Sequence, residues 1–426
     1  MKASPESTGD HTRSRVPDHA TIGGFRIAVV VFGIGVTLPI FYIGSEISLA
    51  LGLRKATLAL FGGCAIVGLM MVVTSIIGAR TRLSTYMIIQ FAFGRGLVRF
   101  LVNPLLAMTY VGYFAATGDI FGGAIRDAVN AFYGIAIPKA LCAFIGSVAM
   151  SLTAMYGFRF IERFSSKAVP LLALFMLYVV YLVLQRNQLQ DLWTVPGAGG
   201  MSVGLAISTV VGANILMAVS GPDLTRYART GLEGVKSVSG LAAGYPLIML
   251  ASGIPALAFA ETDIMKIMVI LGVALPALVI LVFSTWTTNT VNLYSAVLTL
   301  AASFRRYSDK QLAMVAGALG TLGAVLGIMD VFLPFVLILG IATTPIAGVY
   351  IADFFLLSGS AYRLEQLSAR PPVGYSALLA WITGTGVATA ATHGLLVLTT
   401  VPAADGMITA FVLHAVLSRW VLKGKR

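Results

Sequence analysis

The chain has 426 residues, of which 58% are hydrophobic and 11% are charged, and its mean hydropathy is +0.90. Soluble domains carry about 25% charged residues, so this composition excludes an ordinary soluble protein and predicts a membrane protein. The net charge of +12 is attributed to basic loops that face anionic lipid, and no nucleic-acid partner is expected. Cys64 and Cys142 lie in apolar runs and predict no disulfide.

The first 24 residues are polar and contain Pro5, Pro17 and a Gly23-Gly24 pair. They predict a disordered cytoplasmic tail over 1–24 without a cleavable signal sequence. A single transmembrane domain is expected over 25–422, followed by a cytoplasmic end at 423–426. A hydrocarbon core about 30 Å thick needs about 20 apolar residues per helix, and twelve segments of this kind are present. Their approximate centres are Leu38, Ile66, Gly112, Ile145, Met176, Val211, Ile248, Val282, Leu319, Thr343, Thr385 and Leu413.

The basic residues are distributed unequally between the two sides of these segments. With a cytoplasmic N-terminus, 23 of the 29 Lys and Arg residues fall on the inner side. The outer six are Arg54, Lys55, Arg126, Lys139, Arg186 and Lys266. Because cytoplasmic loops are enriched in Lys and Arg, this asymmetry predicts an inner-membrane, multi-pass protein with both termini in the cytoplasm.

The first apolar segment, VVVFGIGVTLPIFYIGSEISLAL (29–51), contains Pro39 near its middle. Proline removes a backbone donor and frees carbonyl groups in the preceding turn. A broken helix of this kind is typical of midplane sites in secondary transporters, although a simple kink is the alternative. The sixth segment, VVGANILMAVSGPD (210–223), holds Asn214 and ends on Ser220-Gly221-Pro222. Asn214 is a site candidate or a hydrogen-bonding contact between helices.

The third segment, LAMTYVGYFAATGDIFGG (106–123), places Tyr110, Tyr113 and Thr117 on one side of a helix. A tyrosine pair at mid-depth predicts an aromatic wall for a flat ligand, and packing alone is the alternative. Two acids lie in outer halves of segments, Glu46 in the first and Asp119 in the third. Intramembrane carboxyls are functional candidates by default. These two either carry a proton, attract a polar substrate, or pair with basic residues such as Arg54 or Arg126.

The eighth segment contains FSTWTTNTVNLYSAVL (283–298), which is unusually polar for a membrane helix. Helical periodicity puts one stripe of hydroxyl and amide groups on one face. The stripe consists of Ser284, Thr287, Thr288, Asn292 and Ser295. Such oxygens either coordinate a hard cation or hydrogen-bond to a neighbouring helix.

Four segments together resemble the nucleobase:cation symporter family, and the similarity spans roughly residues 25 to 420. These segments are GARTRLSTYMIIQFAFGRG, GPDLTRYART, STWTTNTVNLYSAVL and TTPIAGVYIADFF. The resemblance implies twelve transmembrane helices in a leucine-transporter-like fold. Two inverted five-helix repeats cover about 25–186 and 201–357, and two extra helices cover about 374–422. It also implies that the first and sixth helices are discontinuous.

The resemblance further implies the roles of individual residues. The implied sodium ligands are Gly35, Leu38, Ser284, Thr287 and Thr288. The implied substrate positions are Pro39, Tyr110, Tyr113, Thr117, Ala213, Asn214 and Asn292. Relatives that carry cytosine have tryptophan at the position of Tyr113, glutamine at Tyr110 and asparagine at Ser284. An aromatic residue is expected where this chain has Asn214.

The expected function is therefore cation-coupled import of a cytosine-like pyrimidine, purine, hydantoin or hydroxymethylpyrimidine. The coupling ion is Na⁺ or H⁺, and no other cofactor and no enzymatic activity are expected. No nucleotide-binding motif suggests ATP as the driving force. The alternatives are an amino acid or a quaternary amine on the same fold, or a passive channel or membrane enzyme. The expected partners are the substrate and the lipid bilayer, and a monomer is expected.

Overall fold

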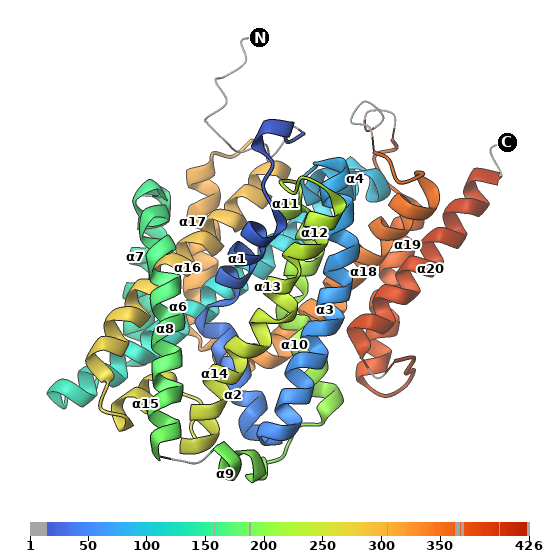
Figure 1. Cartoon of the computed structure of the whole chain (residues 1–426). Coiled ribbons are helices and arrows are strands. Elements are labelled where there is room, and N and C mark those ends of the chain that lie inside the picture. The colour runs from blue at the N-terminus through green and yellow to red at the C-terminus, as the bar shows by residue number, and fades with distance from the viewer. Residues whose placement is uncertain are drawn as a thin grey trace.

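The computed structural model describes residues 15–156, 158–186, 189–304, 306–362, 367, 370–399 and 401–423. In these residues the regular structure is helical, apart from one isolated bridge between Ile22 and Ala228. Figure 1 shows the start of α1 and the end of α20 towards the same end of the molecule, with α9 and α15 at the opposite end.

Five helical segments among the described residues are long and apolar enough to cross a membrane. They are α3 (Leu53–Thr81), α5–η2–α6 (Arg95–Leu97, Val98–Val102, Asn103–Tyr133), α12–α13–α14 (Gly231–Ser237, Ser239–Ala242, Gly244–Phe259), α16 (Ala274–Ser303) and η3–α18–η4 (Ile328–Val331, Phe332–Ala352, Asp353–Leu357). A sixth candidate is the pair α1 (Gly24–Gly35) and α2 (Leu38–Leu51), whose axes differ by 70°.

The remaining long helices are somewhat shorter or more polar. They are α7 (Lys139–Tyr156), α8 (Phe158–Arg186), α10 (Val203–Val219), α17 (Asp309–Val325), α19 (Tyr375–Thr392) and α20 (Pro402–Lys423). Short helices connect them, namely η1 (Asp18–Ala20), α4 (Thr85–Phe93), α9 (Leu189–Thr194), α11 (Gly221–Thr225) and α15 (Ile264–Ile270). The centre of every predicted apolar segment lies in one of the long helices.

The break in the first segment lies just before Pro39. Helix α1 ends at Gly35, and Pro39 occupies the first turn of α2, where its missing N–H is tolerated. The Thr37 amide donates to the Gly35 carbonyl at 2.8 Å, so the two linking residues leave the helix. A Cβ on Gly35 would lie 2.2 Å from the Tyr245 ring, which explains the glycine at this position.

The sixth segment is also interrupted, because α10 ends at Val219 and α11 begins at Gly221 with Pro222 in its first turn. Helix ends leave carbonyl groups without partners in the helix. Here side chains of neighbouring helices supply donors: Thr74 Oγ1 reaches the Ala218 carbonyl at 2.8 Å and Tyr350 Oη reaches the Val219 carbonyl at 2.9 Å. Helices α3 and α18 therefore hold this break in place.

Small residues allow the central helices to approach closely. A Cβ on Gly212 of α10 would lie 2.1 Å from the Val336 carbonyl oxygen of α18, and Gly340 lies directly opposite. Without a hydrophobic driving force between helices in lipid, close backbone packing of this kind stabilises helix pairs. This crossing fixes α10 beside the site.

The expected disordered tail over 1–24 is wrong for its last part. Residues 15–23 pack on the helices, because the Val16 amide donates to the Arg82 carbonyl at 3.1 Å and the Ile22 amide to the Tyr227 carbonyl at 2.7 Å. Val16 is buried, and its side chain supplies the apolar contact that orders this stretch. Residues 1–14 and 424–426 lie outside the described residues.

Candidate functional site

A cavity of about 290 Å³ lies between the two helix breaks, α6, α14 and α16. All seven residues predicted to bind the substrate line it, namely Pro39, Tyr110, Tyr113, Thr117, Ala213, Asn214 and Asn292. The predicted cation ligand Thr288 lines it as well. The structure thus brings together side chains from four segments that are far apart in the sequence.

Tyr113 forms one wall of the central cavity. Its hydroxyl donates to the Ala213 carbonyl at 2.5 Å, which ties α6 to α10. Phe332 packs edge-on against its ring at a centroid distance of 5.8 Å. Thr117 donates to the Tyr113 carbonyl at 2.8 Å and is fully buried. Because the ring is held at both ends, it offers a fixed flat surface to a ligand.

Asn214 is 3% exposed and lines the same cavity. Its Nδ2 donates to the Val210 carbonyl at 2.8 Å within α10. Its Oδ1 is buried and has no hydrogen-bond partner. A buried acceptor without a partner costs about 1–3 kcal/mol, and a donor on a bound ligand would remove that cost.

The polar stripe predicted on the eighth segment is divided between two environments. Thr288, Asn292 and Ser295 line the cavity. Ser284 and Thr287 are buried, and Thr287 Oγ1 donates to the Ser284 carbonyl at 2.9 Å. The amide Asn289 lies on another face, where its Nδ2 contacts Met150 Sδ of α7 at 3.4 Å.

The remaining sodium candidates are close to the first helix break. Gly35 ends α1 and Leu38 begins α2. Leu38 lines a separate outer cavity, while Gly35, Ser284 and Thr287 line neither of the two cavities. The sodium-ligand set therefore stays a prediction.

Several residues of the cavity are not among the sequence-based candidates. Ser220, Asp223 and Tyr245 belong to this group. Asp223 accepts a hydrogen bond from the Thr85 amide at 2.8 Å, and Tyr245 Oη donates to the Val31 carbonyl at 3.1 Å. The predicted end of the sixth segment at Ser220-Gly221-Pro222 lies next to the first two positions, but nothing in the sequence indicates that Tyr245 reaches the first break.

The outer cavity, of about 270 Å³, is lined by Asp119 and by charged residues of α6, α7 and the α14–α15 connection. Asp119 is fully buried and pairs with Lys139 Nζ at 2.5 Å. Its Oδ2 also accepts from the Met329 amide at 3.0 Å. The alternative in which this acid pairs with Arg126 is wrong, because Arg126 pairs with its neighbour Asp127 at 2.6 Å. Asp119 therefore joins α6, α7 and η3.

Glu46 lies outside both cavities. It is half-buried on α2, one helical turn after Tyr42, which lines the outer cavity. No ion pair with Arg54 is present among the described residues. Its role stays a prediction.

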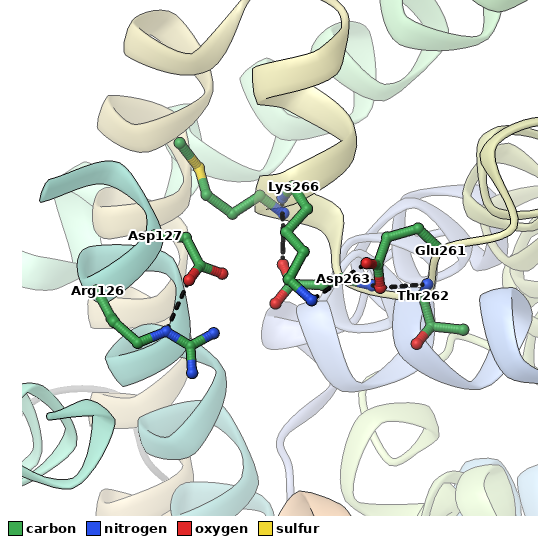
Figure 2. A network of polar contacts seen from close by, with 7 residues as sticks. Arg126, Asp127, Glu261, Thr262, Asp263 and Lys266 are labelled. Atoms are coloured by element: carbon green, nitrogen blue, oxygen red, sulfur yellow. Dashed lines mark hydrogen bonds and ion pairs between the residues drawn. The ribbon is translucent and has the colours of Figure 1, made fainter. Parts of the chain in front are cut away.

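Residues that line the outer cavity take part in a network of polar contacts, which Figure 2 shows. Asp263 is the N-cap residue of α15, and its carboxylate accepts from the Met265 amide at 2.9 Å. Glu261 accepts from the amides of Thr262 and Asp263, each at 3.0 Å, and from Lys266 Nζ at 3.1 Å. The pKa of Asp263 is raised, first by burial and then by the nearby carboxylate of Asp127. The network thus contains two acids that repel each other when both are ionised.

A family model described as "Permease for cytosine/purines, uracil, thiamine, allantoin" matches residues 16–413. The cytosine permease of Escherichia coli (strain K12) is 27% identical over 408 residues, covering 95% of this chain and 94% of that protein. The hydantoin permease of Microbacterium maritypicum is 24% identical over 438 residues, covering 95% of this chain and 87% of that protein.

Solved structures resemble the fold over nearly its whole length. The inward-facing conformation of Mhp1 aligns with a TM-score of 0.85 and 21% identity, covering 99% of this chain and 96% of that one. A closed conformation of Mhp1, a nucleobase-cation-symport-1 family transporter with bromovinylhydantoin bound, aligns with a TM-score of 0.80 at the same identity and coverage. A Na⁺-coupled sialic acid symporter aligns with a TM-score of 0.63 and 14% identity, covering 94% of this chain and 90% of that one.

Proposed function

Since the chain belongs to the family of permeases for cytosine/purines, uracil, thiamine and allantoin, we propose that it is a symporter for a planar nitrogen heterocycle. The family consists of transporters, so the chain is a multi-pass membrane permease and not an enzyme. The substrate class is a cytosine-like pyrimidine, purine, hydantoin or hydroxymethylpyrimidine. The observation that carries the proposal is the central cavity, which lies between two broken helices and is lined by all seven expected substrate residues.

In the proposed binding mode the substrate ring stacks on Tyr113 and its edge meets Asn214. The support is the fixed orientation of the Tyr113 ring and the partnerless Oδ1 of Asn214. An oxygen acceptor of this kind matches a ring N–H or an amino group. With an amide in place of a second aromatic residue, the substrate loses one stacking surface and gains a polar contact.

The charge of the lining favours a neutral substrate over an amino acid. Among the described residues that line the central cavity, Asp223 is the only charged one, and its carboxylate already accepts a hydrogen bond from a backbone amide. A zwitterion buried here would lack a cationic partner for its carboxylate, which is costly in a low-dielectric site. A quaternary amine remains compatible with Tyr110 and Tyr113.

We further propose coupling to Na⁺, held by carbonyls of Gly35 and Leu38 and by Ser284, Thr287 and Thr288. The break between α1 and α2 interrupts the regular hydrogen bonding of the backbone, as in the midplane sites of secondary transporters, and α16 supplies buried hydroxyls. Coupling to H⁺ is the alternative, and Glu46 and Asp119 are then the candidate carriers.

The proposed architecture has twelve transmembrane helices. Two inverted repeats run over 25–186 and 201–357, followed by α19 and α20. The protein is proposed to be a monomer of the cytoplasmic membrane with both termini in the cytoplasm. Each proposed repeat begins with a broken helix, α1–α2 in the first and α10–α11 in the second, and this similarity supports the repeat.

The decisive experiment measures binding of a panel of nucleobases, hydantoins and hydroxymethylpyrimidine to the purified protein, in sodium and in choline buffer. Tyr113→Ala and Asn214→Ala are expected to weaken binding at least about tenfold, because a stacking surface or a buried hydrogen bond is lost. Unchanged affinity in both variants would show that the substrate binds elsewhere.

The coupling ion is tested by Thr288→Ala, which is expected to weaken sodium-dependent binding by about fivefold or more, since a neutral ligand oxygen contributes about 1 kcal/mol. Thr290→Ala is the matched control, because Thr290 lies on the same helix and donates only to the Trp286 carbonyl. Equal wild-type binding in both buffers would exclude sodium coupling. Uptake that never exceeds the external concentration would indicate a passive channel.

A further inference from the structure

A third cavity, of about 460 Å³, shares no lining residue with the central or the outer cavity. It is formed by α4, the start of the long α5–η2–α6 segment and the end of α16. The lining residues are Tyr86, Met87, Gln90, Arg95, Arg99, Ala302 and Leu367. None of these described lining residues is acidic, so within the part of the chain that the structure describes the two guanidinium groups have no counter-charge in the lining.

The sequence places this cavity at the edge of the hydrocarbon core. Residues 100–118 contain no charged side chain, and this length is close to one membrane crossing. Arg99 therefore lies where that crossing begins. Helix α16 is also free of charged residues over Ala274–Ser303 and ends beside Arg99. Both helices thus place the cavity at the depth of lipid headgroups.

Arg99 is held in a defined orientation. Its Nε donates to the carbonyl of Ser303 at 2.5 Å, at the C-terminal end of α16. Asn103 Nδ2 donates to the hydroxyl of the same serine at 2.9 Å. Arg99 lies in a π-helical turn, Val98–Val102, and such turns frequently occur at functional sites. The two terminal nitrogens of Arg99 make no hydrogen bond with any described residue, so they remain available to a ligand.

Two further polar side chains line the cavity, and neither has a partner among the described residues. Gln90 is 5% exposed and lines the cavity. Its side chain makes no hydrogen bond with any described residue. Arg95 is exposed and has neither a hydrogen bond nor an ion pair among them. The buried Gln90 amide, the Arg95 guanidinium and the two terminal nitrogens of Arg99 are donors that match the oxygens of a phosphate group.

We propose that this cavity binds the phosphate-bearing headgroup of an anionic membrane phospholipid. Arg95 and Arg99 contact the phosphate oxygens, and Gln90 contacts the glycerol or the headgroup. Phe100 follows Arg99, is 67% exposed, and lies under the Arg99 guanidinium at 5.1 Å. Its exposed ring provides an apolar surface for an acyl chain directly beside the headgroup site. Basic pockets between transmembrane helices bind lipid headgroups in this way.

The test uses the full chain purified in detergent and titrated with dioleoylphosphatidylglycerol, with thermal unfolding and native mass spectrometry as readouts. Dioleoylphosphatidylcholine and inorganic phosphate serve as parallel probes. Wild type is expected to bind phosphatidylglycerol, and Arg95→Gln/Arg99→Gln to lose at least about tenfold in affinity, because two charge-assisted hydrogen bonds are removed. The matched control is Arg26→Gln/Arg80→Gln, which removes two exposed charges at the same end of the molecule.

Unchanged affinity for phosphatidylglycerol in Arg95→Gln/Arg99→Gln would overturn the proposal, as would an equal loss in the control. Inorganic phosphate that binds as tightly as the lipid would identify a soluble phosphate compound as the ligand and overturn the lipid assignment. If the double variant does not fold, the affinity of the Arg95→Gln single variant for phosphatidylglycerol tests the proposal. This variant is expected to fold, because Arg95 makes no hydrogen bond among the described residues. Transport-substrate affinity is expected to stay unchanged, which separates this site from the proposed function.

Discussion

Among individual residues, Asn214 stands out because its side chain has a buried acceptor without a hydrogen bond. Its Oδ1 is buried beside the central cavity without a partner, while its Nδ2 is satisfied within α10. An apolar residue at this position would avoid the cost of burying an amide. The amide is therefore best explained by a ligand group that completes its hydrogen bonds.

Asp263 provides a pH-dependent test at the same scale. Burial, together with Asp127, raises its pKa, so the folded state binds a proton more tightly than the unfolded state does. The resulting stabilisation is present at low pH and is lost as the pH rises through the raised pKa. Asp263→Asn is therefore expected to raise the melting temperature at neutral pH, and this gain should shrink towards acidic pH. Asparagine keeps the N-cap of α15.

Glu261→Gln is the matched contrast to this variant. Although burial opposes ionisation, the Asp263 amide and Lys266 lower the pKa of Glu261. Its contribution to stability is thus present at neutral pH and is lost as the pH falls through the lowered pKa. Glu261→Gln is expected to lower the melting temperature at neutral pH. Asp263 also faces Arg126 and Lys266 in this network (Figure 2). A gain in melting temperature with Asp263→Asn that does not change with pH would contradict the raised pKa of Asp263.

At the level of elements, the Asp119–Lys139 pair joins α6, α7 and η3. Asp119 is fully buried, whereas the Lys139 side chain is 33% exposed. Lys139→Ala leaves a buried carboxylate without its partner, and the cost is expected near the lower end of the ~3–5 kcal/mol typical of broken buried pairs. Asp119→Asn keeps an acceptor for the Met329 amide and leaves Lys139 near water, so about 1 kcal/mol is expected.

Thermal unfolding of the two variants in detergent checks this asymmetry. Lys139→Ala/Asp119→Asn should recover part of the stability that Lys139→Ala loses, because the stranded charge is removed. Equal losses in the two single variants would mean that the pair does not act through the buried carboxylate.

The crossing of α10 and α18 gives a second prediction for the elements. Gly212→Ala would place a Cβ 2.1 Å from the Val336 carbonyl oxygen, so the helices must separate beside the central cavity. A loss of about 2 kcal/mol or more is expected, as for other overpacked interfaces, together with weaker substrate binding. The control is Gly386→Ala on α19, where no atom lies within 4 Å of the added Cβ. Wild-type melting temperature and binding in Gly212→Ala would refute the close contact.

For the whole molecule, the proposed orientation predicts which residues an impermeant maleimide reaches in intact cells. Tyr133, at the end of α6, and Leu232, near the start of α12, are 75% and 65% exposed. The proposed topology puts them near opposite membrane surfaces. Tyr133→Cys should be labelled from outside, and Leu232→Cys only after permeabilisation. The native Cys64 and Cys142 are buried, so background labelling should be low. The reverse labelling pattern would invert the topology.

Much of the fold is predictable because apolar segments and helix breaks are local properties of the sequence. The centre of every predicted segment lies in a helix, and the breaks follow from Pro39 and Pro222, whose effect on backbone hydrogen bonding is local. The ordered stretch over 15–23 was not predictable, because it depends on contacts with Arg82 and Tyr227, which are distant in the sequence.

The sequence by itself determined that this is a polytopic membrane protein with two interrupted helices and a polar stripe on the eighth segment. Its family motifs also indicated which residues gather around one cavity. Only the tertiary structure decided that Asp119 pairs with Lys139, that Tyr245 packs on Gly35, and that Asn289 points away from the cavity. The physical reason is that helical periodicity fixes the face of a residue on its own helix, whereas its partner depends on how distant helices pack.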